Sequence, residues 1–303
     1  MDKQVLCFGE VLWDGFGTEK KAGGAPMNVA MHLLQQQIPA QMITRIGKDD
    51  LGDELFAYLK AQQFPTQLIQ HDPELPTCLV TVELDENHQA KYIIPQPVSW
   101  DNIQPMNTEK TGIKEAFPFD VIVYGSLACR SETSFTTLLQ LLENPAYKIF
   151  DVNLRPPHFT LATIETLAQQ ADLVKMNEEE ILFLSPQNQQ HISLEEQMKS
   201  FRDRYQNETV CVTLGKHGCI VLHRQQFYKH PGFKVEVADT VGAGDSFLAN
   251  FIAGLINRLP MEEILVNASA IGAFVAGSYG ANPVYDPEKI NAIKKQKQSV
   301  FKH

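Results

Sequence analysis

Short apolar runs alternate with amphipathic helical patterns along most of the chain. The runs with strand-like composition lie at 5–12, 41–47, 120–127, 147–153, 172–177 and 209–214. The stretches with helical spacing lie between them, at 27–36, 52–63, 131–143, 160–170 and 192–205. Because several strand candidates are continuously apolar, we expect them to be covered on both faces. The alternation predicts an α/β fold in which a central, mostly parallel sheet is flanked by helices.

Two segments interrupt this alternation. Residues 77–83 and 90–95 are strand-like runs joined by the polar stretch DENHQ, and together they predict a hairpin. Residues 11–21 carry no clear period and are expected to be irregular. A length of 303 residues with 44% hydrophobic content suffices for one large core, so we interpret 1–303 as a single α/β domain with inserts. The hairpin can be a flap over a site or an ordinary surface hairpin.

Charge and cysteine usage exclude several classes of protein. The formal net charge is −10, and lysines cluster only in a small tail at 294–297, so nucleic-acid binding is not expected. No apolar run of 18 residues occurs, so we expect no membrane-spanning helix. Residues 1–12 predict a first strand rather than a signal peptide. The cysteines form no C-x-x-C pair and are expected to be buried and reduced in a cytoplasmic protein. They are Cys7, Cys78, Cys129, Cys211 and Cys219.

Polar and small residues recur where the predicted strands end. Asp151 and Asn153 close one strand, Lys175 and Asn177 close the next, and Gly215 follows the third. In open α/β sheets, ligands bind beyond the carboxyl ends of the strands. Any one of these residues is more often a turn residue than a ligand contact, but their recurrence predicts a binding site at this edge.

Residues 239–247, DTVGAGDSF, combine a Gly-rich turn with a carboxylate. The motif matches neither the P-loop nor the dinucleotide fingerprint. The apolar residues that follow have helical spacing, so a helix begins near Gly244, and the small residues Gly242 and Ala243 leave its first amides open to an anion. Asp245 would then be a general base that accepts a proton from an attacking hydroxyl while the amides hold a phosphoryl group. The alternative is that Asp245 only caps the helix.

Three weaker motifs favour the same chemistry. AGGAPMNVA (22–30) is a Gly-Gly turn entering a helix, where the backbone and Asn28 could contact a polyhydroxylated ligand. MNEEE (176–180) places an asparagine and a glutamate three positions apart, which suits a hydrated Mg²⁺, although the pattern is also typical of a solvated helix start. TLGKHG (213–218) is a tight turn after a strand and could run beside a nucleotide.

Together these motifs resemble those of sugar kinases of the ribokinase (PfkB) family. AGGAPMNVA and DTVGAGDSF are similar to the two family signatures in order and separation, and the likeness covers nearly the whole chain. FGEVLWD near the start and FDVNLRPP (150–157) are most similar to the fructokinase branch. The resemblance implies a ribokinase-like fold, a mostly parallel sheet flanked by helices with a small β lid. Residues of about 11–21 and 77–95 would form the lid, and lids often pack together in homodimers of the family.

The resemblance also implies roles for individual residues. Asp245 would be the catalytic base, and the amides of Gly242, Ala243, Gly244 and Asp245 would form the anion hole. The other expected contacts are Asp14, Gly24, Asn28 and Arg155 for the sugar; Thr213, Gly215, Gly218 and Lys175 for the nucleotide; Asn177 and Glu180 for Mg²⁺ through water; and Asp239 and Thr240 for K⁺ where it is used. Residues 267–283 would border the adenine, without individual assignments.

The expected function is ATP-dependent phosphorylation of a sugar hydroxymethyl group, with D-fructose as the foremost substrate and Mg²⁺ as cofactor. 2-Keto-3-deoxygluconate, ribose and nucleosides remain open as substrates, and Arg155 is the candidate partner for the carboxylate of a keto acid. A protein of a different class, a non-catalytic sugar or nucleotide sensor with the same fold, would bind these ligands without turnover.

Overall fold

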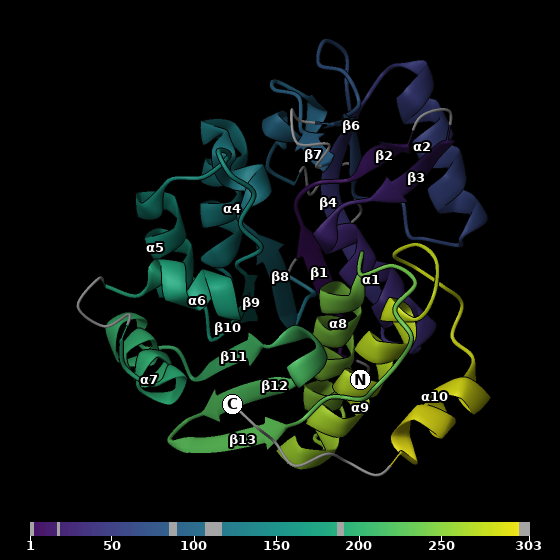
Figure 1. Ribbon diagram of the computed structural model, residues 1–303. Helices are drawn as coiled ribbons and strands as arrows, with labels where there is room; N and C mark the ends of the chain where they lie inside the picture. The colour runs from purple at the N-terminus through teal and green to yellow at the C-terminus, as the bar shows by residue number, and fades with distance from the viewer. Residues whose placement is uncertain (1–2, 17–18, 85–89, 107–116, 187–190, 297–303) are drawn as a thin grey trace.

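The computed structural model describes residues 3–16, 19–84, 90–106, 117–186 and 191–296. Within them, nine strands form one large sheet (Figure 1). Their bounds are β1 Val5–Phe8, β4 Ala40–Gly47, β5 Ile69–Asp72, β8 Val121–Gly125, β9 Tyr147–Asp151, β10 Leu173–Asn177, β11 Thr209–Thr213, β12 Cys219–His223 and β13 Gln226–His230.

The large sheet is mostly parallel, as the alternation of the sequence predicts. Its order is β13-β12-β11-β10-β9-β8-β1-β4-β5. Every neighbouring pair from β11 to β5 is parallel, while β12 and β13 pair antiparallel at one edge. The carboxyl ends of the parallel strands therefore lie along one edge of the sheet, where the polar strand-end residues are gathered.

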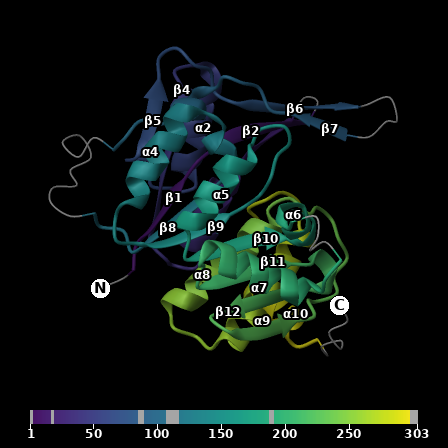
Figure 2. The same ribbon diagram turned by 90° about the vertical axis from the view of Figure 1, so that its left-hand side faces the viewer.

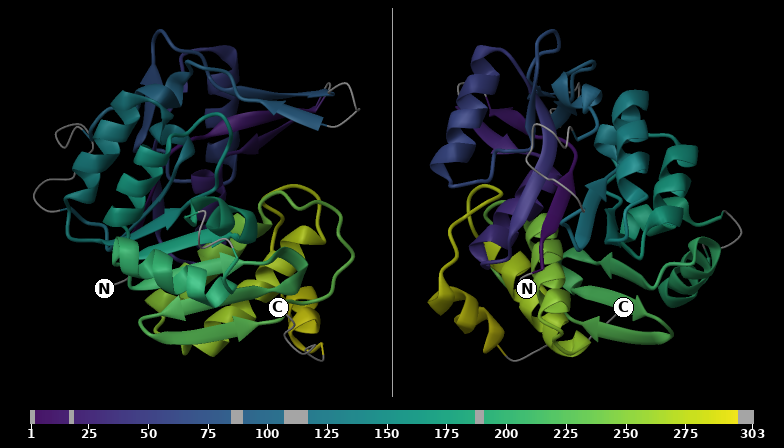
Figure 3. Two further views of the ribbon diagram at one scale, coloured as in Figure 1. Left: turned by 60° about the vertical axis from the view of Figure 1, so that its left-hand side comes forward. Right: turned by 180° about the vertical axis from the view of Figure 1, so that it is seen from behind.

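Helices cover both faces of the sheet (Figure 3). The alternating residues of β1 show why: Leu6 and Phe8 join one apolar cluster, and Val5 and Cys7 join the other. The first cluster includes α4 Glu132–Leu142, α5 Leu161–Gln170, α6 Glu178–Leu184 and α7 Leu194–Tyr205. The second includes α1 Ala25–Gln35, α2 Asp50–Ala61, α8 Ala243–Ile256 and α9 Met261–Ala276.

The remaining described elements are short. Helix α10, Pro287–Lys294, packs against α9 near the carboxyl end of the chain. Three 3₁₀ turns connect longer elements: η1 Ser99–Asn102, η2 Leu127–Arg130 and η4 Gly215–His217. No helix in these parts of the chain is long and apolar enough to cross a membrane.

A second, smaller sheet of four strands has the order β3-β2-β6-β7. Its strands are β2 Leu12–Phe16, β3 Glu19–Gly23, β6 Leu79–Leu84 and β7 Ala90–Ile93. The hairpin pair β6–β7 projects from the body of the molecule, as Figure 2 shows. The segment expected to be irregular, 11–21, is instead the antiparallel pair β2–β3, and β2 joins the second hairpin by parallel pairing with β6.

Some boundaries predicted from the pattern were wrong. The first apolar run, 5–12, is interrupted after Phe8, because Gly9 takes a φ of 146° and Pro26 lies against it. The strands β5, β12 and β13 were not predicted. The loop stretch DENHQ of the hairpin lies outside the described residues. All five cysteines are buried and free, as expected.

Candidate functional site

Helix α8 begins inside the DTVGAGDSF motif, after a glycine that the fold requires. Gly242 has a φ of 78°, and a Cβ added to it would lie 2.6 Å from the carbonyl oxygen of Ala281. Both the left-handed backbone and the close contact favour glycine over any other residue. Gly242 thus turns the chain sharply into the helix and brings the segment around Ala281 against its first turn.

The first amides of α8 precede its hydrogen-bond ladder. Ser246 N–H donates the first intrahelical bond, to the Gly242 carbonyl oxygen at 2.8 Å. Ala243 N–H donates to Thr240 within the turn at 3.3 Å, so this member of the predicted anion hole has an internal partner. The N–H groups of Gly244 and Asp245 donate no hydrogen bond among the described residues. They lie at the positive end of the helix dipole and suit an anion.

The Asp245 carboxylate does not cap its own helix. Its Oδ2 accepts a hydrogen bond from Asn28 Nδ2 of α1 at 2.7 Å, and no side-chain cap is formed at the start of α8. Burial raises the pKa of Asp245, while the Lys175 ammonium and the bond from Asn28 oppose this effect. The carboxylate is therefore held at the start of α8 by a side chain of α1, and its burial favours the protonated form.

Lys175, predicted as a nucleotide contact, lies in a buried ion pair under the start of α8. Its Nζ donates to both carboxylate oxygens of Asp151, at 2.9 and 3.1 Å. A Cβ on Gly244 would lie 3.1 Å from the same Nζ, so the ammonium lies against Gly244 in the first turn of α8. Burial lowers the pKa of Lys175, but the carboxylates of Asp151 and Asp245 outweigh it and keep the amine charged. The pair fixes the Lys175 ammonium beside the first turn of α8, with its charge partnered by Asp151.

The predicted sugar side is formed by β2, the turn before α1, and the segment after β1. Asp14 lies on β2, packed closely over Gly23, and burial raises the pKa of its carboxyl group to about 6. Gly24 has a φ of 116° and touches the Glu10 backbone, which leaves no room for a Cβ. The carboxylate of Glu10 accepts from Ala25 N–H at 3.2 Å, in the first turn of α1.

Glu10 was not predicted, and it is the most unusual carboxyl group of this region. It is only 3% exposed, and its Oε2 has no hydrogen-bond partner among the described residues. Burial raises its pKa to about 7, with Arg155 lowering the pKa and Asp245 raising it. The FGEVLWD motif contains Glu10, but nothing in the motif indicated that its side chain turns toward α1.

Arg155 is exposed, and its guanidinium donates to the neighbouring Leu154 carbonyl oxygen at 3.1 Å. Its charge lowers the pKa of Glu10, Asp14 and Asp245, which places it at the same edge as these carboxyl groups. Arg155 is thus an exposed cation beside these carboxyl groups, in contrast to the buried, ion-paired Lys175.

Asn177 and Glu180 form a capping box at the start of α6. The Asn177 Oδ1 accepts from Glu180 N–H, and the Glu180 Oε2 accepts from Asn177 N–H, both at 2.8 Å. Glu180 Oε1 also accepts from Leu154 N–H at 2.8 Å. The three-residue spacing therefore has a structural cause, and the carboxylate is fixed by two backbone donors. The described residues contain no cluster of three or more His, Cys, Asp or Glu side chains suited to direct metal binding.

The predicted nucleotide residues lie after β11. Thr213 ends the strand, with its hydroxyl donating to Met176 O at 3.4 Å. Gly218 has a φ of 91° and packs against the backbone of His230, whereas Gly215, at 54°, has open space around its Cα. Gly218 is therefore required by the fold, and Gly215 leaves room beside the chain for a ligand.

Asp239 and Thr240, the predicted K⁺ residues, precede the Gly-rich turn. The Asp239 carboxylate accepts from Val241 N–H at 3.0 Å and from Gly280 N–H at 3.3 Å. The backbone of Asp239 also donates to Ala276 at the end of α9. The segment of Asp239 and Thr240, which is expected near a cation, thus lies against Gly280 and the end of α9. Asn282 and His32, which belong to this part of the structure, were not predicted.

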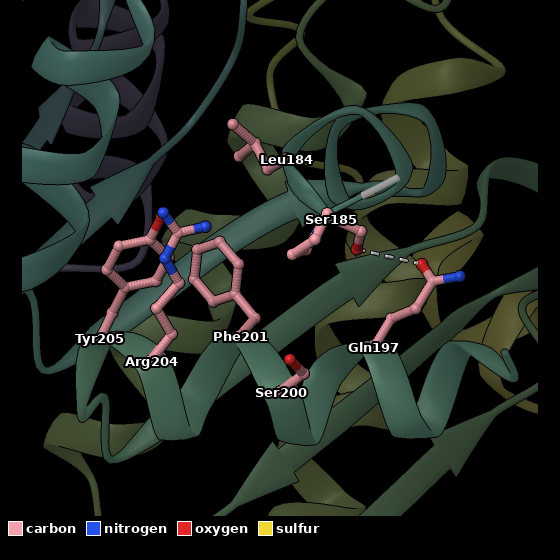
Figure 4. Close-up of a pocket in the computed structure, with 8 residues that line it drawn as sticks. Leu184, Ser185, Gln197, Ser200, Phe201, Arg204 and Tyr205 are labelled. Atoms are coloured by element: carbon pink, nitrogen blue, oxygen red, sulfur yellow. Dashed lines mark hydrogen bonds between the residues drawn. The ribbon is translucent and has the colours of Figure 1, made fainter. Parts of the chain in front are cut away.

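A pocket between α6 and α7 lies apart from this arrangement (Figure 4). It contains none of the residues predicted for the site. Its lining residues are Leu184, Ser185, Pro186, Gln197, Ser200, Phe201, Arg204 and Tyr205.

Comparison with known proteins finds fructokinases both by sequence and by structure. A fructokinase from Salmonella typhimurium is 28% identical over 274 residues, covering 86% of this chain and 87% of that protein. A fructokinase from Xylella fastidiosa, solved with bound ATP, superposes with a TM-score of 0.82 at 22% identity, covering 97% and 98% of the two chains.

A second solved structure shows the same fold. It is a double-mutant fructokinase from Vibrio cholerae O395 with fructose, ADP and potassium ion bound, with a TM-score of 0.80, 24% identity and coverage of 97% and 99%. The family model for pfkB family carbohydrate kinases matches residues 2–288. With a ribokinase-like fold, a small lid sheet and a family match over nearly its whole length, this chain is a member of the pfkB family of carbohydrate kinases.

Proposed function

We propose that the protein transfers the γ-phosphoryl group of ATP to a hydroxymethyl group of D-fructose. The observation that carries this proposal is the convergence at the start of α8: the Asp245 carboxylate and the N–H groups of Gly244 and Asp245 lie within one helical turn. A base and an anion hole at the same place are what phosphoryl transfer to a hydroxyl requires. The ligands of the Xylella and Vibrio fructokinases support the choice of ATP and fructose.

In the proposed reaction, Asp245 accepts the proton of the sugar hydroxyl as its oxygen attacks the γ-phosphorus. The bond from that phosphorus to the β–γ bridging oxygen breaks, and ADP leaves with the bond electrons. The amides of Gly244 and Asp245 hold the transferring oxygens, and the Lys175 ammonium lies beside Gly244 at the same turn, paired with Asp151. Asn28 keeps the carboxylate oriented toward the substrate. The products are a sugar phosphate and ADP.

The chain offers a fitting position for Mg²⁺ through water, at Asn177 and Glu180. Each Glu180 oxygen accepts one backbone hydrogen bond and retains a second lone pair for a metal-bound water. When bound with ATP, Mg²⁺ neutralises phosphate charge. For K⁺, the loop of Asp239 and Thr240 lies against Gly280, whose N–H donates to the Asp239 carboxylate. We propose both ions as cofactors, Mg²⁺ as required and K⁺ as an activator.

The charge of the site favours a neutral sugar over a keto acid. Glu10, Asp14 and Asp245 all lie on the predicted sugar side, and the Lys175 charge is engaged by Asp151. Arg155 is then left as the cation for a substrate carboxylate, which would have to approach three carboxyl groups. Fructose adds no charge and can donate its hydroxyl groups to these acceptors, so we prefer it to 2-keto-3-deoxygluconate.

We further propose that residues 1–303 form a single kinase domain whose small sheet closes over the sugar and pairs with that of a second copy. Asp14 on β2 supports the first part, since closing this sheet would bring its carboxylate to the sugar. The free, buried cysteines fit a reducing compartment, so we place the enzyme in the cytoplasm.

An ADP-release assay with a panel of sugars tests the substrate. The panel contains D-fructose, 2-keto-3-deoxygluconate, ribose, a nucleoside and a no-sugar control, each with ATP, Mg²⁺ and K⁺. We expect the highest kcat/KM with D-fructose. A higher value with the keto acid would overturn the charge argument. Binding of sugar and ATP without any ADP formation would overturn catalysis and favour the alternative of a sensor.

A further inference from the structure

We propose that Asn282 is a positioning residue for the catalytic base and acts on it through Asn28. The proposal rests on the proposed function only for its kinetic consequence, because the side-chain contacts stand without it. Asn282 lies in the segment 280–285, which follows α9 and to which the sequence analysis assigned no individual role.

Three side chains from distant parts of the chain form one hydrogen-bonded row. Asn282 Nδ2 donates to Asn28 Oδ1 at 2.7 Å, and Asn28 Nδ2 donates to Asp245 Oδ2 at 2.7 Å. Asn28 belongs to α1 and Asp245 to α8, two helices that pack side by side (Figure 1). The row therefore connects the base, at the start of α8, to a segment that begins only after α9.

The chemistry of the row fixes the direction of each amide. An ionised carboxylate only accepts hydrogen bonds, so Asn28 must turn its NH₂ group toward Asp245. The Asn28 carbonyl oxygen then faces Asn282, which must present its own NH₂ group. Consistent with this imposed orientation, the Asn282 Oδ1 is buried without a partner among the described residues. A buried acceptor without a partner destabilises the fold. The Asn282 amide takes this orientation because its NH₂ group must face Asn28, which in turn orients the base.

The segment 280–285 is itself held on both sides of Asn282. His32, one turn after Asn28 on α1, contacts the Ala281 carbonyl oxygen through Nε2 and the Tyr285 hydroxyl through Nδ1, both at 2.9 Å. Because a carbonyl only accepts, Nε2 carries the proton, and Nδ1 accepts from Tyr285. His32 is fully buried, and burial lowers its pKa to about 4, which keeps this neutral form.

The two hydrogen bonds of His32 therefore fix the segment on both sides of Asn282, and Asn282 can in turn fix the orientation of Asn28. The charged groups around Asp245 come from several elements: Lys175 on β10, Asp151 at the end of β9, Arg155 after β9 and Glu10 after β1. None of these contacts Asn282 in the described structure. A change at residue 282 that keeps the net charge should therefore reach Asp245 through Asn28.

The test is Asn282→Leu, which keeps the net charge. Asn282→Asp is a second variant that also adds a negative charge, so only its kcat is compared. Leu has similar size and no hydrogen-bonding group. The carbonyl oxygen of Asn28 therefore loses the donor that fixes the orientation of its amide. Asp only accepts, so it draws the Asn28 NH₂ group away and turns a carbonyl oxygen toward Asp245. We expect kcat to fall by about tenfold with Leu, the scale of one hydrogen bond to a charged group, and further with Asp.

Two readouts separate positioning from folding. The ¹³C titration of the Asp245 carboxyl, assigned with Asp245→Asn, and the acid limb of the kcat/KM profile should both move to higher pH, because the aligned donor that lowers the pKa of Asp245 is lost. Asn250→Leu is the matched control. It removes one amide bond, to Gln36 at 2.6 Å, elsewhere on α8, and should change neither readout.

An unchanged Asp245 titration in a folded Asn282→Leu protein would overturn the proposal, whatever the loss of activity. If that variant does not fold, Asn282→Ala gives the same comparison with a smaller side chain that also has no hydrogen-bonding group. A wild-type protein without kinase activity would refute the proposed function alone, because the carboxyl titration tests the row without turnover.

Discussion

Two helices start with Gly-rich turns at the same site, and they use their first amides differently. At α1, which follows Gly23 and Gly24, Ala25 N–H donates to the carboxylate of Glu10. At α8, which follows Gly242, the N–H groups of Gly244 and Asp245 have no protein acceptor among the described residues. The start of α1 is closed by a carboxylate from elsewhere in the chain, and the start of α8 is left open.

The difference shows that a Gly-rich turn before a helix is not itself an anion site. Both turns have a positive end of the helix dipole and a glycine with positive φ. What distinguishes them is the residue that reaches the turn from another element: a carboxylate at α1, and the Lys175 ammonium beneath α8. At α1 a carboxyl group from another element occupies the first amide, and among the described residues no acceptor occupies the amides of Gly244 and Asp245 at α8.

The largest expected effect follows from removing the base beside the open turn. Asp245→Asn should lower kcat by about 10² or more, because the general base is lost while the amides remain. Steady-state ADP release gives kcat, and calorimetric titration should show that ATP and fructose still bind. Near-normal turnover by a folded Asp245→Asn protein would contradict the role of Asp245.

The second prediction compares one glycine from each turn. Gly242→Ala should lower kcat/KM for ATP by roughly 10- to 100-fold, because positive φ and the contact with Ala281 force the anion hole to shift. Gly24→Ala should act on folding, lowering the free energy of unfolding by about 1–3 kcal/mol. Thermal unfolding and ATP kinetics on both proteins check the contrast. Equal effects on ATP kinetics would remove the distinction between the turns.

The third prediction concerns the cation under α8. Lys175→Met should reduce kcat by about tenfold and destabilise the fold by about 3–5 kcal/mol, because Asp151 is left buried and unpaired. The double variant Lys175→Met with Asp151→Asn should recover stability in denaturant unfolding but not kcat. Recovery of both would show that the pair serves only the fold.

The fourth prediction concerns the closed turn. Glu10 has a pKa of about 7 in the folded protein against an ordinary value of 4.5, so the folded state binds an extra proton between these pH values. Wild-type stability should therefore fall as pH rises from 4.5 to 7, by about 3 kcal/mol from this group. Glu10→Gln, which keeps an acceptor for Ala25, should lack this component. If the free energy of unfolding depended on pH in the same way in both proteins, Glu10 would not be a buried carboxyl group with a raised pKa.

The sequence predicted those parts of the structure that depend on local pattern. Apolar periodicity gave most strands and helices, and the spacing of DTVGAGDSF placed Asp245 at a helix start. The partners that distinguish the two turns could not be predicted, because they come from remote positions: Glu10 at α1, and Asp151 under Lys175. The contact between Asn282 and Asn28 joins residues 254 positions apart and leaves no local signal. The segment 11–21 was missed as strands although β2 pairs locally with β3, because β3 is polar and mostly exposed and so lacks the apolar alternation of a half-buried strand.

A crystal structure of the protein with fructose and a non-hydrolysable ATP analogue tests the central claim most directly. The account predicts that γ-phosphate oxygens lie within hydrogen-bonding distance of the Gly244 and Asp245 amides, with a fructose hydroxymethyl oxygen beside the Asp245 carboxylate. A nucleotide whose phosphates lie away from the start of α8, or a sugar out of reach of Asp245, would contradict it.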